Sequence, residues 1–272
     1  MNIFKLELKR AIFNKWTLFA FLIALIICLL PIPQKYEYMN NTYGEQIANS
    51  TDSVTCITTV FYNWLLFDRS DILLYIFIFI MPLLVALPYG ASYYNDLKSG
   101  YNKQIISRCH FRTYAIAKYF AAFISGGLVI VLPLVIQFMI LMLIFPLDKP
   151  LRFFSLMIGE TTFSIDLFYE HPILHTLLWC AIVFIVAGLL ATLSLAVSRM
   201  VYNYFGIILT PFVISFILVF LTYVTGRSEL SFIYTLSTNC LYDMNYGILF
   251  AEIIVMFIVS FIPFVFQKKE VL

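Results

Sequence analysis

Residues 119–145 read YFAAFISGGLVIVLPLVIQFMILMLIF, a run of 27 residues that contains no Asp, Glu, Lys or Arg. A helix rises about 1.5 Å per residue, so this run would extend roughly 40 Å, more than the hydrocarbon core of about 30 Å in a bilayer. Gly126, Gly127 and Pro133 lie inside the run, so a tilt or a bend is expected there. The stretch therefore predicts a membrane-spanning helix.

Five further apolar runs have the length of a bilayer crossing, and all six are continuous, whereas a membrane β-barrel needs alternating apolar and polar residues. Of the whole chain, 62% is hydrophobic and 12% is charged, against about 25% charged in a soluble domain. We therefore predict an all-α integral membrane protein with six transmembrane helices and exclude a water-soluble one. Residues 1–272 form a single transmembrane domain with spans at about 16–32, 72–89, 119–145, 177–197, 204–224 and 246–266.

The basic residues are distributed unevenly between the two sides of this predicted bundle. Twelve of the 17 Lys and Arg lie on the side of both chain ends, and the other five share the opposite side with eleven of the 15 acidic residues. Because Lys and Arg are enriched in cytoplasmic loops, we expect a multi-pass protein of the cell (plasma) membrane with both termini in the cytoplasm. The twelve are Lys5, Lys9, Arg10, Lys15, Lys98, Lys103, Arg108, Arg112, Lys118, Arg199, Lys268 and Lys269. The net charge of +2 is too small to indicate a nucleic-acid partner.

Three connections on the predicted external side are long, at residues 33–71, 146–176 and 225–245. They mix apolar with polar residues, as at 61–67 and 153–157, and short external helices at the membrane surface would explain this composition. Ordinary loops with interfacial aromatic residues are the alternative. Only a tight turn fits between the fourth and fifth spans, at residues 198–203.

Two polar segments lie on the predicted cytoplasmic side. In the first, Phe4, Leu8, Ala11, Ile12 and Trp16 fall near one helical face and Glu7, Arg10 and Asn14 on another, which predicts an amino-terminal interfacial helix. The second, residues 93–118, reads YYNDLKSGYNKQIISRCHFRTYAIAK. It can form short helices that present charge to a partner, or it can be a solvated loop.

This layout resembles the permease subunits of type-2 ABC exporters. The resemblance rests on the basic segment 4–15 before the first span, on the acid, small residue and glycine at Asp96, Ser99 and Gly100, and on Arg112 with Ala115, Ala117 and Lys118 leading into the third span. It implies a permease that forms half of an export pathway beside a second permease copy or paralogue, driven by a separate ABC ATPase subunit.

The same resemblance implies an ATPase-coupling loop that contains Asp96, Ser99, Gly100, Arg108 and Arg112. The chain has no G-x-x-x-x-G-K-[ST] loop to bind phosphates, so we expect it to be no enzyme, to bind no cofactor, and to use ATP that is bound on the partner subunit. The expected substrate is amphipathic or hydrophobic: a peptide, a drug or a lipid-like molecule. An ATPase-independent secondary transporter or channel is an alternative, as is a membrane peptide-binding immunity or sensor protein.

Two polar residues inside spans are candidates for the substrate pathway. Glu252 is an acid within the sixth span, where a charge costs about 2.5–3.5 kcal/mol at the centre, so it should face protein, water or a partner. The alternatives are that Glu252 reaches the external interface or is protonated. Gln137 is the weaker candidate, because a single amide is more often a bond between helices.

Other chemistry is poorly supported. Ser125 precedes Gly126 and Gly127, which indicates close helix packing rather than a nucleophile. His171 and His175 have helical spacing, but no third ligand is evident, so no metal is expected. Cys56 and Cys240 are both in predicted external segments and could pair, although their separation is not fixed by the sequence.

Overall fold

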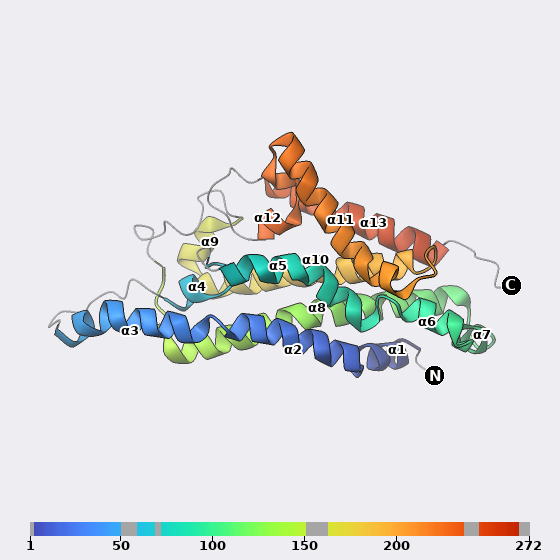
Figure 1. Cartoon of the computed structure of the whole chain (residues 1–272), viewed down its shortest axis with the longest axis horizontal. Helices are drawn as coiled ribbons and strands as arrows, with labels where there is room; N and C mark the ends of the chain where they lie inside the picture. The colour runs from blue at the N-terminus through green and yellow to red at the C-terminus, as the bar shows by residue number, and fades with distance from the viewer. Residues whose placement is uncertain (1–2, 50–58, 69–71, 151–162, 237–244, 267–272) are drawn as a thin grey trace.

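The computed structural model describes residues 3–49, 59–68, 72–150, 163–236 and 245–266. Within these ranges every regular element is a helix, and most of the long helices follow one common axis (Figure 1). The amino-terminal half contains α1 (Ile3–Ile12), α2 (Lys15–Leu29), α3 (Ile32–Asn49), α4 (Val60–Asn63), α5 (Ile72–Tyr89), α6 (Ser92–Lys98), α7 (Tyr101–Ile106) and α8 (Phe111–Ile144). The rest contains α9 (Ile165–Glu170), α10 (Pro172–Val197), α11 (Tyr204–Thr225), the 3-10 turn η2 (Ser228–Leu230), α12 (Phe232–Leu236) and α13 (Tyr246–Phe266).

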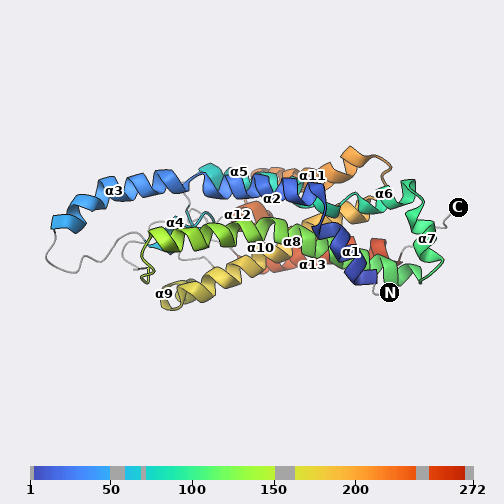
Figure 2. The same cartoon turned by 90° about the horizontal axis from the view of Figure 1, so that it is seen from below.

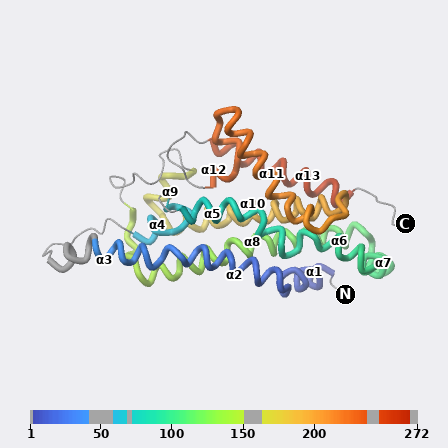
Figure 3. The backbone as a smooth tube through the Cα atoms, in the orientation of Figure 1, coloured from blue at the N-terminus to red at the C-terminus, as the bar shows by residue number. Residues whose placement is uncertain are grey.

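In the described part of the chain, six helical stretches are long and apolar enough to cross a membrane. They are Lys15–Asn41, Ile72–Lys98, Phe111–Ile144, Pro172–Val197, Tyr204–Thr225 and Tyr246–Phe266. The predicted fold class is therefore confirmed: this is an all-α multi-pass membrane protein. Helices α1, α6 and α7 lie near the carboxyl end of α13 at one end of the bundle, and α4 and α9 lie at the other end (Figure 3).

Helix α10 forms the centre of the bundle. Its span is 78% buried, whereas the spans of α11 and α13 are each 28% buried. Helix α10 packs against α8, α13, α5 and α11, and Figure 2 shows it running beside α8. The outward faces of α11 and α13 are apolar, as expected for helices that contact lipid.

The segment Ser125-Gly126-Gly127 lets α8 and α10 approach closely, as predicted. A Cβ atom on Gly126 would lie 2.5 Å from the Cβ of Ala191, and one on Gly127 would meet the ring of Phe184 at 2.5 Å. The Ser125 hydroxyl donates to the carbonyl of Ala122 in its own helix, 3.2 Å away. These small residues serve helix packing.

The boundaries of three spans differ from the prediction. The first was expected to end at Pro31 and Pro33. The helix is instead interrupted for two residues after Leu29 and then continues as α3 to Asn49. Pro33 lies in the first turn of α3, where its missing N–H costs no helical hydrogen bond. The third span begins at Phe111 rather than 119, and the fourth begins at Pro172 rather than 177, so His175 lies inside a span. The fifth and sixth spans agree within one residue, and α5 ends at Tyr89 as predicted, although the helical stretch continues after a short turn through α6 to Lys98.

Residues 61–67 are not at the membrane surface, where the prediction placed their apolar side chains. Phe61, Trp64, Leu65 and Phe67 are fully buried, because the segment folds back against the bundle beside α8. The Trp64 indole N–H donates to the carbonyl of Leu134, 3.0 Å away. The short helices α4, α9 and α12 agree with the expected short helices, while residues 153–157 lie outside the described part of the chain.

Arg199, in the predicted tight turn between the fourth and fifth spans, is buried. Its Nη1 donates to the carbonyl oxygens of Pro263 and Phe264 at 2.8 and 2.7 Å. The last carbonyls of a helix have no partner within the helix, so a cation is favourable there. Arg199 thereby ties the turn after α10 to the carboxyl end of α13.

Candidate functional site

Helices α1, α6 and α8 meet around four charged side chains that we call the buried ion cluster: Glu7 and Arg10 of α1, Asp96 of α6 and Lys118 of α8. Lys118 Nζ lies 2.5 Å from Asp96 Oδ2 and 3.1 Å from Glu7 Oε2. Arg10 reaches Asp96 Oδ1 at 2.8 Å and Glu7 Oε1 at 3.1 Å. Each carboxylate is thus shared by two cations, and the cluster joins three helices.

Two tyrosines complete the coordination of the carboxylates. The Tyr114 hydroxyl donates to Asp96 Oδ2 at 2.6 Å, and the Tyr89 hydroxyl donates to Glu7 Oε2. Lys118 Nζ lies 4.8 Å from the ring centroid of Tyr89 and 5.1 Å from that of Tyr114. Both distances are in the range of a cation–π contact, so the rings stabilise the ammonium group as well.

The cluster is balanced in charge and almost closed to solvent. Glu7 and Lys118 are 0% exposed and Asp96 is 2% exposed, whereas the Arg10 side chain is 38% exposed. Two acids face two cations, so no net charge is buried. Since desolvating an ion costs several kcal/mol, removal of one member would leave an uncompensated charge. The arrangement is stable only while α1, α6 and α8 stay together.

Arg10 is the member of the cluster that reaches the surface. Burial alone would lower the pKa of its guanidinium, but the hydrogen bond to Asp96, with the charges of Tyr89, Asp96 and Glu7, raises that pKa above its ordinary value. The guanidinium also lies 4.3 Å from the ring centroid of Tyr101 on α7. Arg10 therefore stays charged and also contacts α7.

The acid, small residue and glycine pattern has a local structural role. Ser99 ends α6, and Gly100 follows with a φ of 74°, a left-handed conformation that glycine adopts without steric cost. The chain can therefore turn directly from α6 into α7. This confirms the predicted short helices and holds Asp96 on the inner side of α6.

The structure separates the predicted coupling residues. Ser99 and Arg108 are exposed, and Arg112 is exposed with its guanidinium 5.6 Å from the ring centroid of Phe266. Asp96 lies in the same segment, but its carboxylate is buried and is bonded by Arg10 and Lys118, so its charge is not at the surface. Glu7, on the predicted polar face of the amino-terminal helix, points into the bundle and is fully buried.

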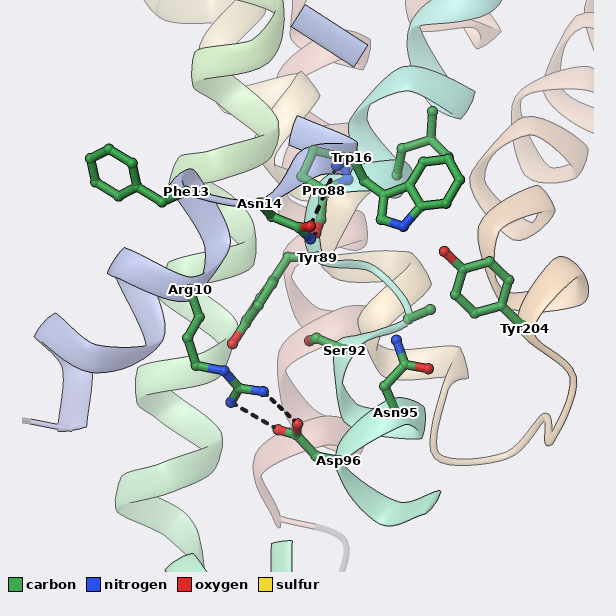
Figure 4. Close-up of a pocket in the computed structure, with 12 residues that line it drawn as sticks. Arg10, Phe13, Asn14, Trp16, Pro88, Tyr89, Ser92, Asn95, Asp96 and Tyr204 are labelled. Atoms are coloured by element: carbon green, nitrogen blue, oxygen red, sulfur yellow. Dashed lines mark hydrogen bonds and ion pairs between the residues drawn. The ribbon is translucent and has the colours of Figure 1, made fainter. Parts of the chain in front are cut away.

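A polar pocket of about 300 Å³ adjoins the cluster where α1, α2, α5, α6 and α11 come together (Figure 4). At its corner, Asn14 Nδ2 donates to the Pro88 carbonyl at 3.0 Å, and Asn14 Oδ1 accepts from the N–H of Trp16 at 3.4 Å. These bonds fix the bend between α1 and α2 against the end of α5. The residues that line it include Arg10, Trp16, Ser92, Asn95 and Tyr204.

Comparisons with protein-family models, with curated proteins and with solved structures find no match to this chain. The side chains and their geometry are therefore the observations on which a functional assignment must stand.

The two pathway candidates differ in their surroundings. Gln137 is fully buried on α8: its Nε2 donates to the Cys28 carbonyl at 2.7 Å, and its Oε1 accepts from the N–H of Leu65 at 3.3 Å. Both polar groups have partners, as expected for a bond between helices. Glu252 on α13 is partly buried, and its Oε2 has no hydrogen-bond partner among the described residues. Glu252 is thus the stronger candidate for contact with a ligand.

The remaining candidates belong to the packing of the bundle or lie outside the described residues. His175 is buried in α10, its Nε2 donates to the Phe163 carbonyl oxygen at 3.1 Å, and its ring stacks on Trp179. Within the described ranges no group of three His, Cys, Asp or Glu side chains could hold a metal. Cys56 and Cys240 lie outside those ranges.

Sequence reasoning did not identify Arg10, Lys118 and Tyr114 as partners of Asp96, or Glu7 and Tyr89 as further members of the site. One signal was present: residues 111–125 contain neither Gly nor Pro, so the third helix could be extended back through Lys118. That extension would have placed a lysine inside a helix and required a buried partner for it.

Proposed function

We propose that this chain is the membrane-spanning permease subunit of an ATP-driven ABC exporter, which moves an amphipathic or hydrophobic substrate out of the cell. The observation that carries the proposal is the buried ion cluster, which connects the short helices α6 and α7 to α8. Helix α8 has 34 residues, so it extends about 51 Å and can carry a displacement across the bilayer.

The pair α6 and α7 has the features of a docking element. Its exposed side bears Lys98 and Lys103, and Arg108 follows in the turn after α7. Together they form a basic surface that suits an acidic patch on a separate ATPase subunit. When that subunit moves α6, Lys118 must follow Asp96, because separating a buried pair leaves an uncompensated charge at a cost of about 3–5 kcal/mol. The cluster would thus couple ATP hydrolysis on the partner to movement of α8.

The proposal includes the plasma membrane, cytoplasmic termini and a second permease copy or paralogue. The excess of Lys and Arg at the end that carries α1, α6 and α7 supports a cytoplasmic location for that end. A second subunit is supported by the packing of α10, which fills the middle of the described bundle. A substrate route would then form between two subunits.

Copurification with an ATPase tests this function. Arg108→Glu reverses a charge on the docking surface and should abolish copurification and substrate-stimulated ATP hydrolysis. Arg227→Glu reverses an exposed charge after α11, on the predicted external side, and should change neither. Equal ATPase binding by both variants, or the lack of any bound ATPase in the wild type, would contradict the proposal.

Orientation has its own test. A cysteine placed at Lys103 should react with an impermeant thiol reagent only after the membrane is opened, whereas one placed at Arg227 should react in intact cells. The reverse pattern would place α6 and α7 outside.

A secondary transporter is the second candidate, and the carboxyl of Glu252 favours it. A partly buried acid without a partner among the described residues can bind a proton or a cationic substrate within the membrane. Uptake into proteoliposomes that contain this chain alone, driven by a proton gradient and lost in Glu252→Gln, would support this candidate over the exporter.

A further inference from the structure

The polar pocket beside the buried ion cluster lies at the level where three spans begin or end. Helix α2 starts at Lys15, α5 ends at Tyr89 and α11 starts at Tyr204. Trp16, 48% exposed, and Tyr204 stand at its rim (Figure 4). Tryptophan and tyrosine are enriched where a membrane meets water, so this pocket opens at the depth of lipid headgroups.

Hydrogen-bond donors dominate its polar lining. Arg10 contributes a guanidinium that stays partly exposed, and Asn95 adds an exposed amide. The carboxylate of Asp96 is already held by Arg10, Lys118 and Tyr114, so it offers little to a further ligand. Donors in excess of free acceptors suit an anion, and a guanidinium suits a phosphate in particular.

Ser92 is a second and independent sign of a ligand. Its side chain is among those that line the pocket, the residue is 8% exposed, and its hydroxyl has no hydrogen-bond partner among the described residues. Buried polar groups in folded proteins nearly always have a partner. A ligand oxygen in the pocket would supply one.

An apolar path leaves the pocket along α5. Leu87 lines the pocket, and the partly exposed residues of α5 continue from it through Leu83, Phe79 and Ile76 to Ile72. Helix α5 packs against both α2 and α11, and Figure 1 shows it between them. From Leu87 to Ile72 this stripe extends about 22 Å, enough for an acyl chain that follows the helix into the bilayer.

We propose that the pocket binds the phosphate headgroup of a phospholipid, with Arg10, Ser92 and Asn95 around the phosphate and an acyl chain along α5. A volume of about 300 Å³ is at the lower end for a ligand site and suits a headgroup rather than a whole lipid. The proposal is independent of ATP-driven export, since binding requires neither an ATPase nor a second subunit.

Mass spectrometry of the purified full chain, after exchange into a phosphate-free detergent, tests the site by counting the phospholipids that each protein retains. Asn95→Asp places a carboxylate in the pocket and should lower retention about fivefold, because two anions a few ångström apart repel each other. Gln104→Glu adds the same charge on the exposed side of α7, away from the pocket, and should match the wild type. Wild-type protein that retains no phospholipid, or equal retention by both variants, would overturn the proposal.

Competition on the wild-type protein distinguishes the sources of binding and needs no variant. A single-chain lysophospholipid should displace the retained lipid, whereas inorganic phosphate and an alkyl glucoside of equal chain length should not at the same concentration. Displacement by phosphate would indicate a free-anion site, and displacement by the glucoside would indicate chain binding without headgroup recognition. Either result would refute the phospholipid assignment.

Discussion

Replacing Lys118 by methionine tests whether the buried ion cluster holds the end of the bundle together. Methionine keeps the length and much of the volume of lysine but removes its charge. In the wild type two cations balance two carboxylates, whereas the variant leaves Arg10 alone with Glu7 and Asp96, a net charge of −1. Because Glu7 is 0% and Asp96 2% exposed, water cannot screen the excess, and we expect a loss of about 3–5 kcal/mol in the free energy of unfolding.

The assay is unfolding in mixed micelles by titration with SDS, followed by tryptophan fluorescence. Lys98→Met is the matched control, since Lys98 is an exposed lysine at the end of α6. Its loss should change the free energy of unfolding by less than about 0.5 kcal/mol. A similar small change for Lys118→Met would refute the idea that the cluster is a closed, balanced unit.

A double variant gives a sharper test, because it restores the charge balance. Asp96→Asn alone leaves a net charge of +1, whereas Lys118→Met combined with Asp96→Asn leaves one cation and one carboxylate. We therefore expect the double variant to be more stable than the sum of the two losses predicts, by about 1–3 kcal/mol. Additive losses would show that the two side chains act independently and would contradict the 2.5 Å contact between them.

Three further predictions concern the packing and the ends of the helices. Gly126→Ala should lower the free energy of unfolding by about 1–3 kcal/mol, because the new Cβ would clash with α10. Gly206→Ala is the control: its nearest neighbour is a side chain at 3.4 Å, so this change should be neutral or stabilising. The melting temperatures of the two variants compare these effects. Arg199→Met should lower the free energy of unfolding by about 2–4 kcal/mol in the same SDS titration, because the last carbonyls of α13 lose their hydrogen-bond donor. Arg227 is exposed, so Arg227→Met should leave this free energy almost unchanged. Glu252→Gln should leave the melting temperature unchanged or higher, and a lower value would reveal a structural partner for the carboxyl.

The spans were predictable because the bilayer imposes a length on apolar runs. Residues 72–89 and 246–266 match α5 and α13, and no packing detail was needed for them. The predicted boundaries were wrong where a helix extends beyond its apolar stretch. Helix α8 can begin at Phe111 because no residue between there and 119 breaks a helix. Hydropathy alone does not detect helical turns that are made of polar residues.

The late predicted start of the third span is also the reason why the buried ion cluster was not predicted. Because residues 93–118 were left open as short helices or a solvated loop, no partner was assigned to Asp96 or Lys118, and their 22-residue separation indicated no contact. Once α8 includes Lys118, the lysine is fixed on a helix face that meets α1 and α6. Burial of one charge then requires a partner of opposite sign, and Asp96 and Glu7 are the acids that these helices supply.

Gln137 and Glu252 give the same signal in the sequence, a single polar side chain within an apolar span, yet their environments differ. The amide of Gln137 is satisfied by the carbonyl of Cys28, 109 residues away in the sequence, and by the N–H of Leu65. Hydropathy contains no information about such backbone groups, because every residue supplies them wherever the fold brings them close. Glu252 Oε2 has no such partner among the described residues, and an unbonded carboxyl in a membrane span has a cost that a bound proton, cation or substrate would offset. Transport assays should therefore begin with Glu252→Gln and use Gln137→Leu as the variant whose effect is on stability.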